Sequence, residues 1–240
     1  MEKTKAKSNP RIDQMFSVGA HFGYAKSRRH PTTAPYIFGS KNRIEIINLE
    51  KTEELLEKAL EFVKKIASEG GQILFASSKP EARDAIKKAA AALEMPFVAG
   101  RWIGGTFTNF PQIKKRIERF EMLTAQREKG ELGKYTKKER LLIDREIAKL
   151  DRFFSGLLSL KGMPKALFVI DSDKEEIAVA EAEKTNIPVI ALSSSDCDLS
   201  RVDHPILAND SAMASISFFL EKIVEAYRGS KKVDAPKPKA

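Results

Sequence analysis

The chain has 240 residues, 42% of them hydrophobic and 31% charged, which is enough to bury a substantial core and excludes a disordered tail or scaffold segment. Its single cysteine, Cys197, excludes a disulfide framework and a cysteine-rich zinc module. No window nears the roughly 18 apolar residues of a membrane span and no signal-peptide core follows Met1, so we expect a cytoplasmic protein without membrane contact. The formal net charge at pH 7 is +9.

Short runs rich in Ile, Val and Phe alternate with helical patterns along most of the chain. We expect strands at residues 44–49, 72–76, 97–98, 166–170 and 189–192. We expect helices at residues 52–69, 80–94, 175–186 and 211–227, the first of them capped by Thr52. Strands and helices that alternate in this way are typical of an α/β fold in which a parallel sheet carries helices on both faces.

Between residues 108 and 160 the hydrophobic period is that of helices, and no strand is expected. Ile113, Ile117 and Phe120 recur at steps of four and three, as do apolar residues from 143 to 157, which is the spacing of a coiled-coil seam. A glycine-containing turn at 129–133 separates the two halves, and 136–139 fits a helix capping box. We therefore predict a projecting helical hairpin; two helices folded back as an ordinary subdomain are the alternative.

These patterns divide the chain into three parts. We predict an α/β sheet domain at residues 1–107 and 160–228 and a coiled-coil hairpin insertion at 108–159. The last part, residues 229–240, is rich in Lys, Pro and Ala and is predicted to be a flexible basic tail.

The positive charge is unevenly distributed along the chain. Residues 1–51 hold 10 basic and 4 acidic side chains, and residues 101–165 hold 16 and 8. Residues 166–229, in contrast, hold 5 basic and 12 acidic side chains. This asymmetry indicates contact with a polyanion on selected faces, whereas a basic surface kept for solubility would carry its charge more evenly.

Carboxylates after an expected strand provide the main argument for an enzyme. Asp171 and Asp173 follow the run at 166–170 and could hold magnesium beside a phosphorylated substrate. In the alternative, Asp173 caps the next helix while Glu175 and Glu176 complement the helix dipole. Residues 100–106 have the glycine spacing of a phosphate loop but no lysine, so we take this match as a coincidence. Because the structural alternative is favoured at the carboxylates as well, we expect no catalytic residue, metal or cofactor. A third hypothesis is a protein-interaction module whose hairpin seam binds a partner helix.

The segment at residues 19–43 favours RNA. Aromatic and imidazole groups, including His21 and Tyr24, lie near glycines and are followed by cations with few acidic neighbours. Flexible backbone, stacking faces and cations together suit irregular RNA, although the aromatic side chains could instead pack onto the sheet. The same choice between stacking and core packing applies to Trp102, which follows Arg101. The cations that we expect to pair with RNA phosphates are Arg28, Arg29, Lys41 and Arg43.

Several blocks together resemble the bacterial ribosomal protein S-two family of the small ribosomal subunit. They include GAHFGY at residues 19–24, KNRIEIINLEKT at 41–52, GRWIGGTFTN at 100–109, TKKE at 136–139 and MPKALFVIDSDKE at 163–175. The resemblance extends over about residues 12–227. Within it, Tyr24 stands where the family usually has a second histidine, and Arg43 where glycine is common.

The resemblance implies a flavodoxin-like α/β domain with a protruding coiled coil that contacts small-subunit rRNA and has no catalytic activity. It also implies neighbouring small-subunit proteins as partners and, in the bacteria that carry it, the large OB-fold ribosomal protein that captures messenger RNA. The residues expected at the rRNA are His21, Tyr24, Arg28, Arg29, Lys41, Asn42, Arg43, Arg101, Trp102, Thr108, Asn109, Lys114, Lys115, Lys137 and Lys138.

Overall fold

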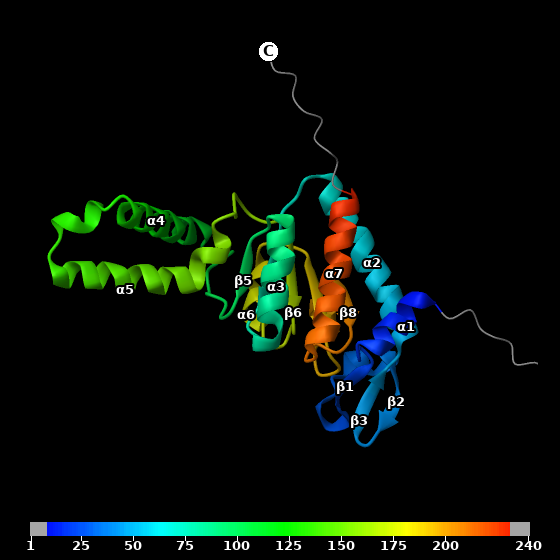
Figure 1. Cartoon of the computed structure of the whole chain (residues 1–240). Coiled ribbons are helices and arrows are strands. Elements are labelled where there is room, and N and C mark those ends of the chain that lie inside the picture. The colour runs from blue at the N-terminus through cyan, green and yellow to red at the C-terminus, as the bar shows by residue number, and fades with distance from the viewer. Residues whose placement is uncertain (1–8, 231–240) are drawn as a thin grey trace, which may run out of the picture.

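The structure is a computed structural model that describes residues 9–230. Its centre is a five-stranded parallel sheet in the order β5-β4-β6-β7-β8 (Figure 1). Counted along the chain within this sheet, the order is 2-1-3-4-5, which is the flavodoxin-like arrangement, so the predicted class of the sheet domain is confirmed; the coiled-coil insertion stays a prediction. The strands are β4 (Ile73–Ser77), β5 (Phe97–Ala99), β6 (Ala166–Ile170), β7 (Val189–Ser193) and β8 (His204–Leu207).

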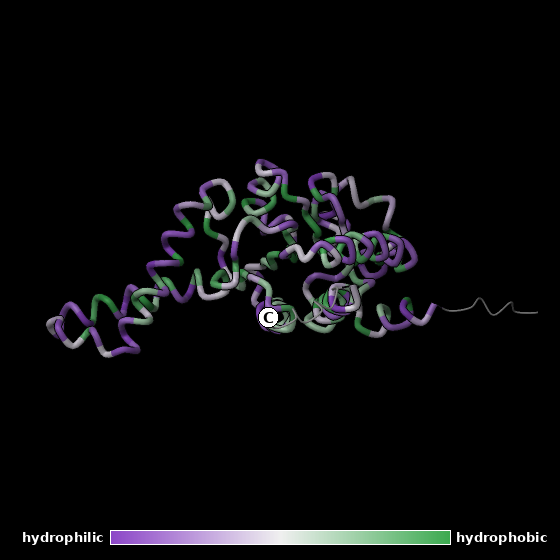
Figure 2. The backbone as a smooth tube through the Cα atoms, turned by 90° about the horizontal axis from the view of Figure 1, so that it is seen from above, coloured by the Kyte–Doolittle hydropathy of each residue, from purple (hydrophilic) through white to green (hydrophobic). Residues whose placement is uncertain are grey.

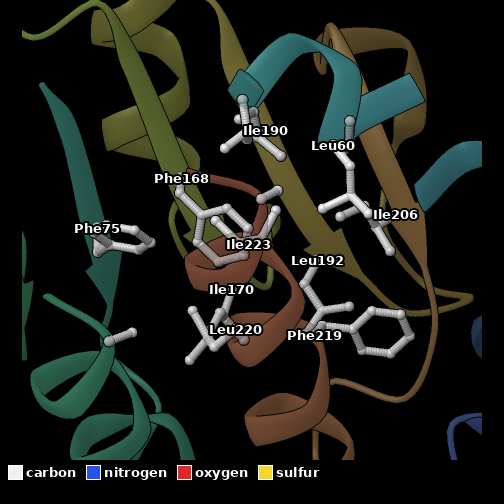
Figure 3. Close-up of a cluster of buried hydrophobic side chains, with 14 of the residues drawn as sticks. Leu60, Phe75, Phe168, Ile170, Ile190, Leu192, Ile206, Phe219, Leu220 and Ile223 are labelled. Atoms are coloured by element: carbon white, nitrogen blue, oxygen red, sulfur yellow. The ribbon is translucent and has the colours of Figure 1, made fainter. Parts of the chain in front are cut away.

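The strands of this sheet are continuous apolar runs because both of their faces are covered. Along β4, Ile73 and Phe75 face one hydrophobic cluster, while Leu74 and Ala76 face a second cluster on the opposite side. Figure 3 shows the first cluster, in which Phe168 and its neighbours pack against side chains of a covering helix such as Phe219. The helices on this face are α2 (Leu49–Ser68), α3 (Pro80–Leu93) and α7 (Met213–Ser230).

The second face is covered by α6 (Glu176–Lys184) and by the base of a helical pair. The pair consists of α4 (Phe110–Glu128) and α5 (Lys137–Phe154), joined through η3 (Glu131–Lys134) and followed by η4 (Ser155–Leu157). We call residues 110–154 the helical pair.

The helical pair extends away from the sheet beside β5 (Figure 1). Hydrophilic residues make up much of the helical pair, and shorter hydrophobic stretches lie between them along the chain (Figure 2). The predicted capping box is confirmed, because Thr136 and Glu139 bond each other's backbone amides at the start of α5. The two helices contact along a buried seam formed by Ile113, Ile117, Phe120, Leu123, Ile147, Leu150 and Phe154.

Residues before α2 form a separate antiparallel sheet, in the order β1-β3-β2. The strand that we predicted at residues 44–49 lies in this sheet rather than in the parallel one, and it ends at Ile47. A two-residue turn joins β2 to β3 and returns the chain antiparallel, which a strand–helix–strand pattern cannot reveal. The elements of this region are α1 (Pro10–Ser17), β1 (Phe22–Ala25), η1 (Lys26–Arg28), η2 (Pro31–Tyr36), β2 (Ile37–Lys41) and β3 (Ile44–Ile47).

Two predicted helix boundaries need correction. Asn48, not Thr52, caps α2, because its side chain accepts from the amide of Glu50; the buried Thr52 hydroxyl instead donates to the carbonyl of Leu207 at 2.7 Å. Helix α7 continues to Ser230, so residues 229–230, which we predicted as part of a flexible tail, are helical; the rest of that prediction, residues 231–240, lies outside the described part. Among the helices of residues 9–230, none combines the length and apolar character needed to cross a membrane.

Candidate nucleic-acid interface

The carboxyl edge of the parallel sheet, where this fold usually binds ligands, holds a buried cluster of charges. The ammonium of Lys79 lies 2.8 Å from a carboxylate oxygen of Asp171 and 2.8 Å from one of Asp210. All three side chains are buried. Burial raises the pKa of Asp210 to about 6 even though the charge of Lys79 lowers it. The cluster therefore fills the switch point between β4 and β6 with an internal ion pair.

Cys197 adjoins this cluster, and its Sγ lies 3.7 Å from Oδ1 of Asp171. Donor atoms of Cys197, Asp171 and Asp210 are within 4.8 Å of one another, which is close enough to hold a metal ion. The ammonium of Lys79, however, already contacts both carboxylates. Burial raises the pKa of the Cys197 thiol to about 12, so the thiolate that a metal would require is disfavoured.

The magnesium hypothesis required Asp171 and Asp173 to converge, and the structure does not bring them together. Asp171 is buried against Lys79, whereas Asp173 lies on an exposed turn. The expectation that Asp173 caps α6 is also wrong. The N-cap position is Glu175, without a side-chain cap bond, and it is Asp171 whose side chain accepts from an amide of the turn, that of Lys174, at 3.1 Å.

The N-terminal segment is tied to the loops that follow β7 and β8. The hydroxyl of Ser195 accepts from the amide of Tyr24 at 2.9 Å, and the carbonyl of Ser195 accepts from the hydroxyl of Thr33 at 2.9 Å. The amide side chain of Asn209 donates to the carbonyl of Gly19 at 3.0 Å. The segment expected to bind RNA therefore lies over the carboxyl edge of the sheet near β7 and β8.

Two of the predicted arginines differ in their surroundings. Arg28 is exposed, and its guanidinium carbon lies 5.1 Å from the ring centroid of Tyr24. Arg29 instead pairs with the buried carboxylate of Glu45 at 3.2 Å. Our expectation that these cations lack an acidic partner is thus wrong for Arg29, because β3 brings Glu45 next to it.

The ring of His21 lies against two aromatic side chains, stacked on Phe16 and tilted against Phe22. Its centroid lies 4.4 Å from that of Phe16 and 4.0 Å from that of Phe22. Burial lowers the pKa of His21, so the imidazole is neutral at pH 7. Phe16 is 62% exposed and Phe22 is 45% exposed, so this cluster of three rings is partly in contact with solvent.

Lys41, Asn42 and Arg43 form the tip of the β2–β3 hairpin, and all three side chains are exposed. Asn42 and Arg43 both have left-handed backbones, with φ of 52° and 67°. A two-residue hairpin turn of this kind suits asparagine and glycine, and arginine is strained there. The turn therefore holds the cation of Arg43 on a strained backbone, and this side chain makes no ion pair with another described residue.

The loop at residues 100–109 is organised by a buried carboxylate that sequence analysis did not find. One oxygen of Glu181 accepts from the amide of Gly105 at 2.6 Å, and the other accepts from the amides of Phe107 at 2.9 Å and Thr108 at 3.3 Å. Trp102 is 6% exposed, donates its indole N–H to Glu181 and packs edge-on against Phe107. Of the two roles left open for Trp102, the structure supports core packing.

The remaining predicted contacts lie around the base and along the surface of the helical pair. Arg101 and Asn109 are exposed, and Asn109 is at the N-cap position of α4 without a side-chain cap bond. Lys137 and Lys138 occupy the first turn of α5, where a cation is unfavourable beside the helix dipole. Local helix stability therefore does not explain these two lysines. The other exposed cations predicted on the pair are Lys114 and Lys115.

The predicted residues form two groups at opposite edges of the parallel sheet. The group at residues 21–43 lies on the side of β8, and the group at residues 101–138 lies on the side of β5 (Figure 1). A sequence model of the family described as Ribosomal protein S2 matches residues 15–230, which includes both groups and the sheet between them. Because this match covers most of the chain, the protein belongs to the ribosomal protein S2 family.

Proposed function

We propose that this protein is a structural constituent of the small ribosomal subunit that binds small-subunit rRNA through its N-terminal segment and its helical pair. Membership in the S2 family implies a structural ribosomal protein of the small subunit, in the cytoplasm, rather than an enzyme. In this proposal residues 108–159 are a coiled-coil insertion in a sheet domain made of residues 1–107 and 160–228, supported by the buried seam of the pair.

The observation that carries the proposal is the placement of exposed cations in two groups that point away from the core. Arg28, Lys41 and Arg43 belong to the first group, and the lysines of the helical pair belong to the second. None of these side chains forms a salt bridge with another of residues 9–230. Phosphates of an RNA would supply the missing negative charge, and many such contacts would bind the protein firmly without base recognition.

Neighbouring small-subunit proteins are the second class of proposed partner, among them the large OB-fold protein that binds messenger RNA. Phe38 on β2 is 78% exposed, and Phe16 on α1 is 62% exposed. Apolar rings at such exposures are not required for phosphate contact, whereas aromatic side chains are enriched in protein interfaces. Their position beside the first group of cations supports a protein neighbour there.

Sedimentation of the tagged protein with small subunits from its own cell extract tests the proposal. The variant Lys137→Gln with Lys138→Gln, and the variant Arg28→Gln with Lys41→Gln, should dissociate from the subunit peak at lower salt than the wild type. The matched control, Lys58→Gln with Lys65→Gln, removes two exposed charges from α2 and should behave as the wild type. Wild-type protein that stays at the top of the gradient at low salt would refute the proposal.

A further inference from the structure

Two clefts meet at the base of the helical pair. The first, of about 590 Å³, is lined by α3, by β5 and the loop after it, and by the end of α5. The second, of about 420 Å³, is lined by the loop at 101–104 and by both helices of the pair. Arg101 and Phe153 line both clefts. We call the two clefts together the hairpin-base groove. Figure 1 shows β5 and the base of the helical pair, which contribute to its lining, next to each other.

Cations dominate the ionisable groups of this groove. The only acidic side chain among the residues that line it is Asp151. No cation of the groove forms a salt bridge with another of residues 9–230. Like charges gathered in this way repel one another, and an anion bound among them would relieve this repulsion. The six cations are Arg83, Lys87, Arg101, Arg116, Lys149 and Arg152.

The wall of the groove includes the backbone of an edge strand in addition to charged side chains. β5 is an edge strand that pairs only with β4, so its other edge leaves backbone amides and carbonyls without a strand partner. Gly156 lies so close to this strand that an added Cβ would be 2.2 Å from the carbonyl oxygen of Phe97. This contact holds η4, and with it the end of α5, against β5.

Phe153 gives the groove an apolar surface between its two halves. The side chain is half-buried, and the guanidinium carbon of Arg152 lies 5.5 Å from the centroid of its ring. An aromatic ring next to arginine is a surface on which a nucleotide base or sugar can pack. Cations on both sides of such a ring fit a ligand whose anionic groups are regularly spaced along an extended chain.

We propose that the hairpin-base groove binds the sugar–phosphate backbone of one rRNA strand. Arg83 and Lys87 on α3 contact phosphates on one side of Arg101, and Arg116 and Lys149 contact phosphates on the other side. This inference rests on the proposed function and deepens it by assigning the strand to a surface of which sequence analysis found only Arg101 and Trp102. A protein partner would need a long run of acidic residues to match the same cations, which makes RNA the better fit.

A cleavage probe attached to the groove tests the assignment directly. The native thiol, Cys197, is buried, so a cysteine introduced at the surface can be labelled selectively with an iron chelate that generates hydroxyl radicals. Ser155→Cys places the probe at the groove, and Ser68→Cys at the end of α2 is the matched control. Both serines are exposed. The hydroxyl of Ser155 donates to the carbonyl of Asp151 in the last turn of α5 at 2.6 Å, and that of Ser68 to the carbonyl of Lys65 in the last turn of α2 at 2.7 Å.

In small subunits reconstituted with the full chain, the probe at residue 155 should cut rRNA within one short contiguous stretch, which the probe at residue 68 leaves intact. If both variants bind subunits but the probe at residue 155 cuts only a neighbouring protein, or nothing, the groove assignment is wrong while the proposed function stands. If the wild type itself does not bind subunits, the proposed function fails, and the assignment that rests on it fails as well.

Charge removal supplies an independent measurement on the same complex. Arg83→Gln with Lys87→Gln, and separately Arg116→Gln with Lys149→Gln, should each reduce the slope of log affinity against log salt by about 1.4 to 1.8, as loss of two phosphate contacts predicts. The control Lys58→Gln with Lys65→Gln should leave the slope unchanged. Groove variants that retain the wild-type slope would overturn the assignment.

Discussion

The carboxylate of Glu181 on α6 accepts a hydrogen bond from the backbone amide of Phe107 at 2.9 Å. The same carboxylate binds the amides of Gly105 and Thr108, so three donors of one loop converge on a single buried side chain. This loop directly precedes α4. Glu181 therefore fixes the direction in which the helical pair leaves the sheet, and it connects the core of the protein to the second group of cations.

Replacement of Glu181 by glutamine should disrupt this loop, because an amide nitrogen cannot accept from backbone N–H groups. We expect Glu181→Gln to lower the free energy of unfolding by about 2 kcal/mol, as measured in urea, since hydrogen bonds to a charged acceptor are lost. The control Glu183→Gln, exposed on the same helix, should change it by less than about 0.5 kcal/mol. Equal effects of the two variants would show that the loop does not depend on Glu181.

The charge cluster at the carboxyl edge predicts a large effect of Lys79→Met. This variant leaves Asp171 and Asp210 buried without a counter-ion and should lower the free energy of unfolding by about 3 to 5 kcal/mol at pH 7. Adding Asp210→Asn to it should restore part of the loss, because one unpaired carboxylate is removed. Lys88→Met, at an exposed position of α3, is the control. A loss for Lys79→Met no larger than for the control would contradict the role of the cluster.

The raised pKa of Asp210 predicts a pH dependence of stability. Because burial raises it from the usual 3.8 to about 6, the folded protein holds this proton more tightly than the unfolded chain does. The contribution of Asp210 to stability is therefore most favourable below about pH 4 and is lost as the pH rises through 6.

The stability difference between wild type and Asp210→Asn, measured by urea unfolding at each pH, isolates this effect. Between pH 4 and pH 7 the stability of the wild type should fall relative to that of Asp210→Asn by about 2 kcal/mol, as a shift from 3.8 to about 6 requires. A difference that stays constant over this range would mean that Asp210 titrates at its ordinary pKa in the folded protein.

The left-handed backbone of Arg43 predicts that glycine at this position stabilises the fold. Arg43→Gly should raise the free energy of unfolding by about 1 kcal/mol, because the strain of a side chain at positive φ is removed. Asn42→Gly should gain less, since asparagine tolerates this conformation. In the proposed complex Arg43→Gly should also reduce the slope of log affinity against log salt by the amount expected for the loss of about one phosphate contact. A stability loss would show that the arginine side chain contributes a contact of its own.

Much of the sheet could be predicted because its central strands are buried on both faces and appear as uninterrupted apolar runs. Strand β8 was missed because His204 and Pro205 interrupt its apolar run. Strands β1 and β2 were missed because they are short, and irregular pairing disturbs their alternation.

The candidate site was harder to predict than the fold, because its partners are distant in sequence. Exposed cations such as Lys41 could be identified from composition alone. The pairing of Arg29 with Glu45, and of Glu181 with a loop more than seventy residues earlier, depends on tertiary packing. A glutamate in an alanine-rich helix gives no local signal that it is buried, since the same residue at a neighbouring position, Glu183, is exposed.

The salt dependence of binding to small subunits stripped of this protein tests the account most directly. If many exposed cations neutralise rRNA phosphates, log affinity should fall linearly with log salt concentration, with a slope of magnitude at least about 4, as six or more phosphate contacts would give. A slope near zero, or no binding even at low salt, would contradict the claim that these cations bind ribosomal RNA.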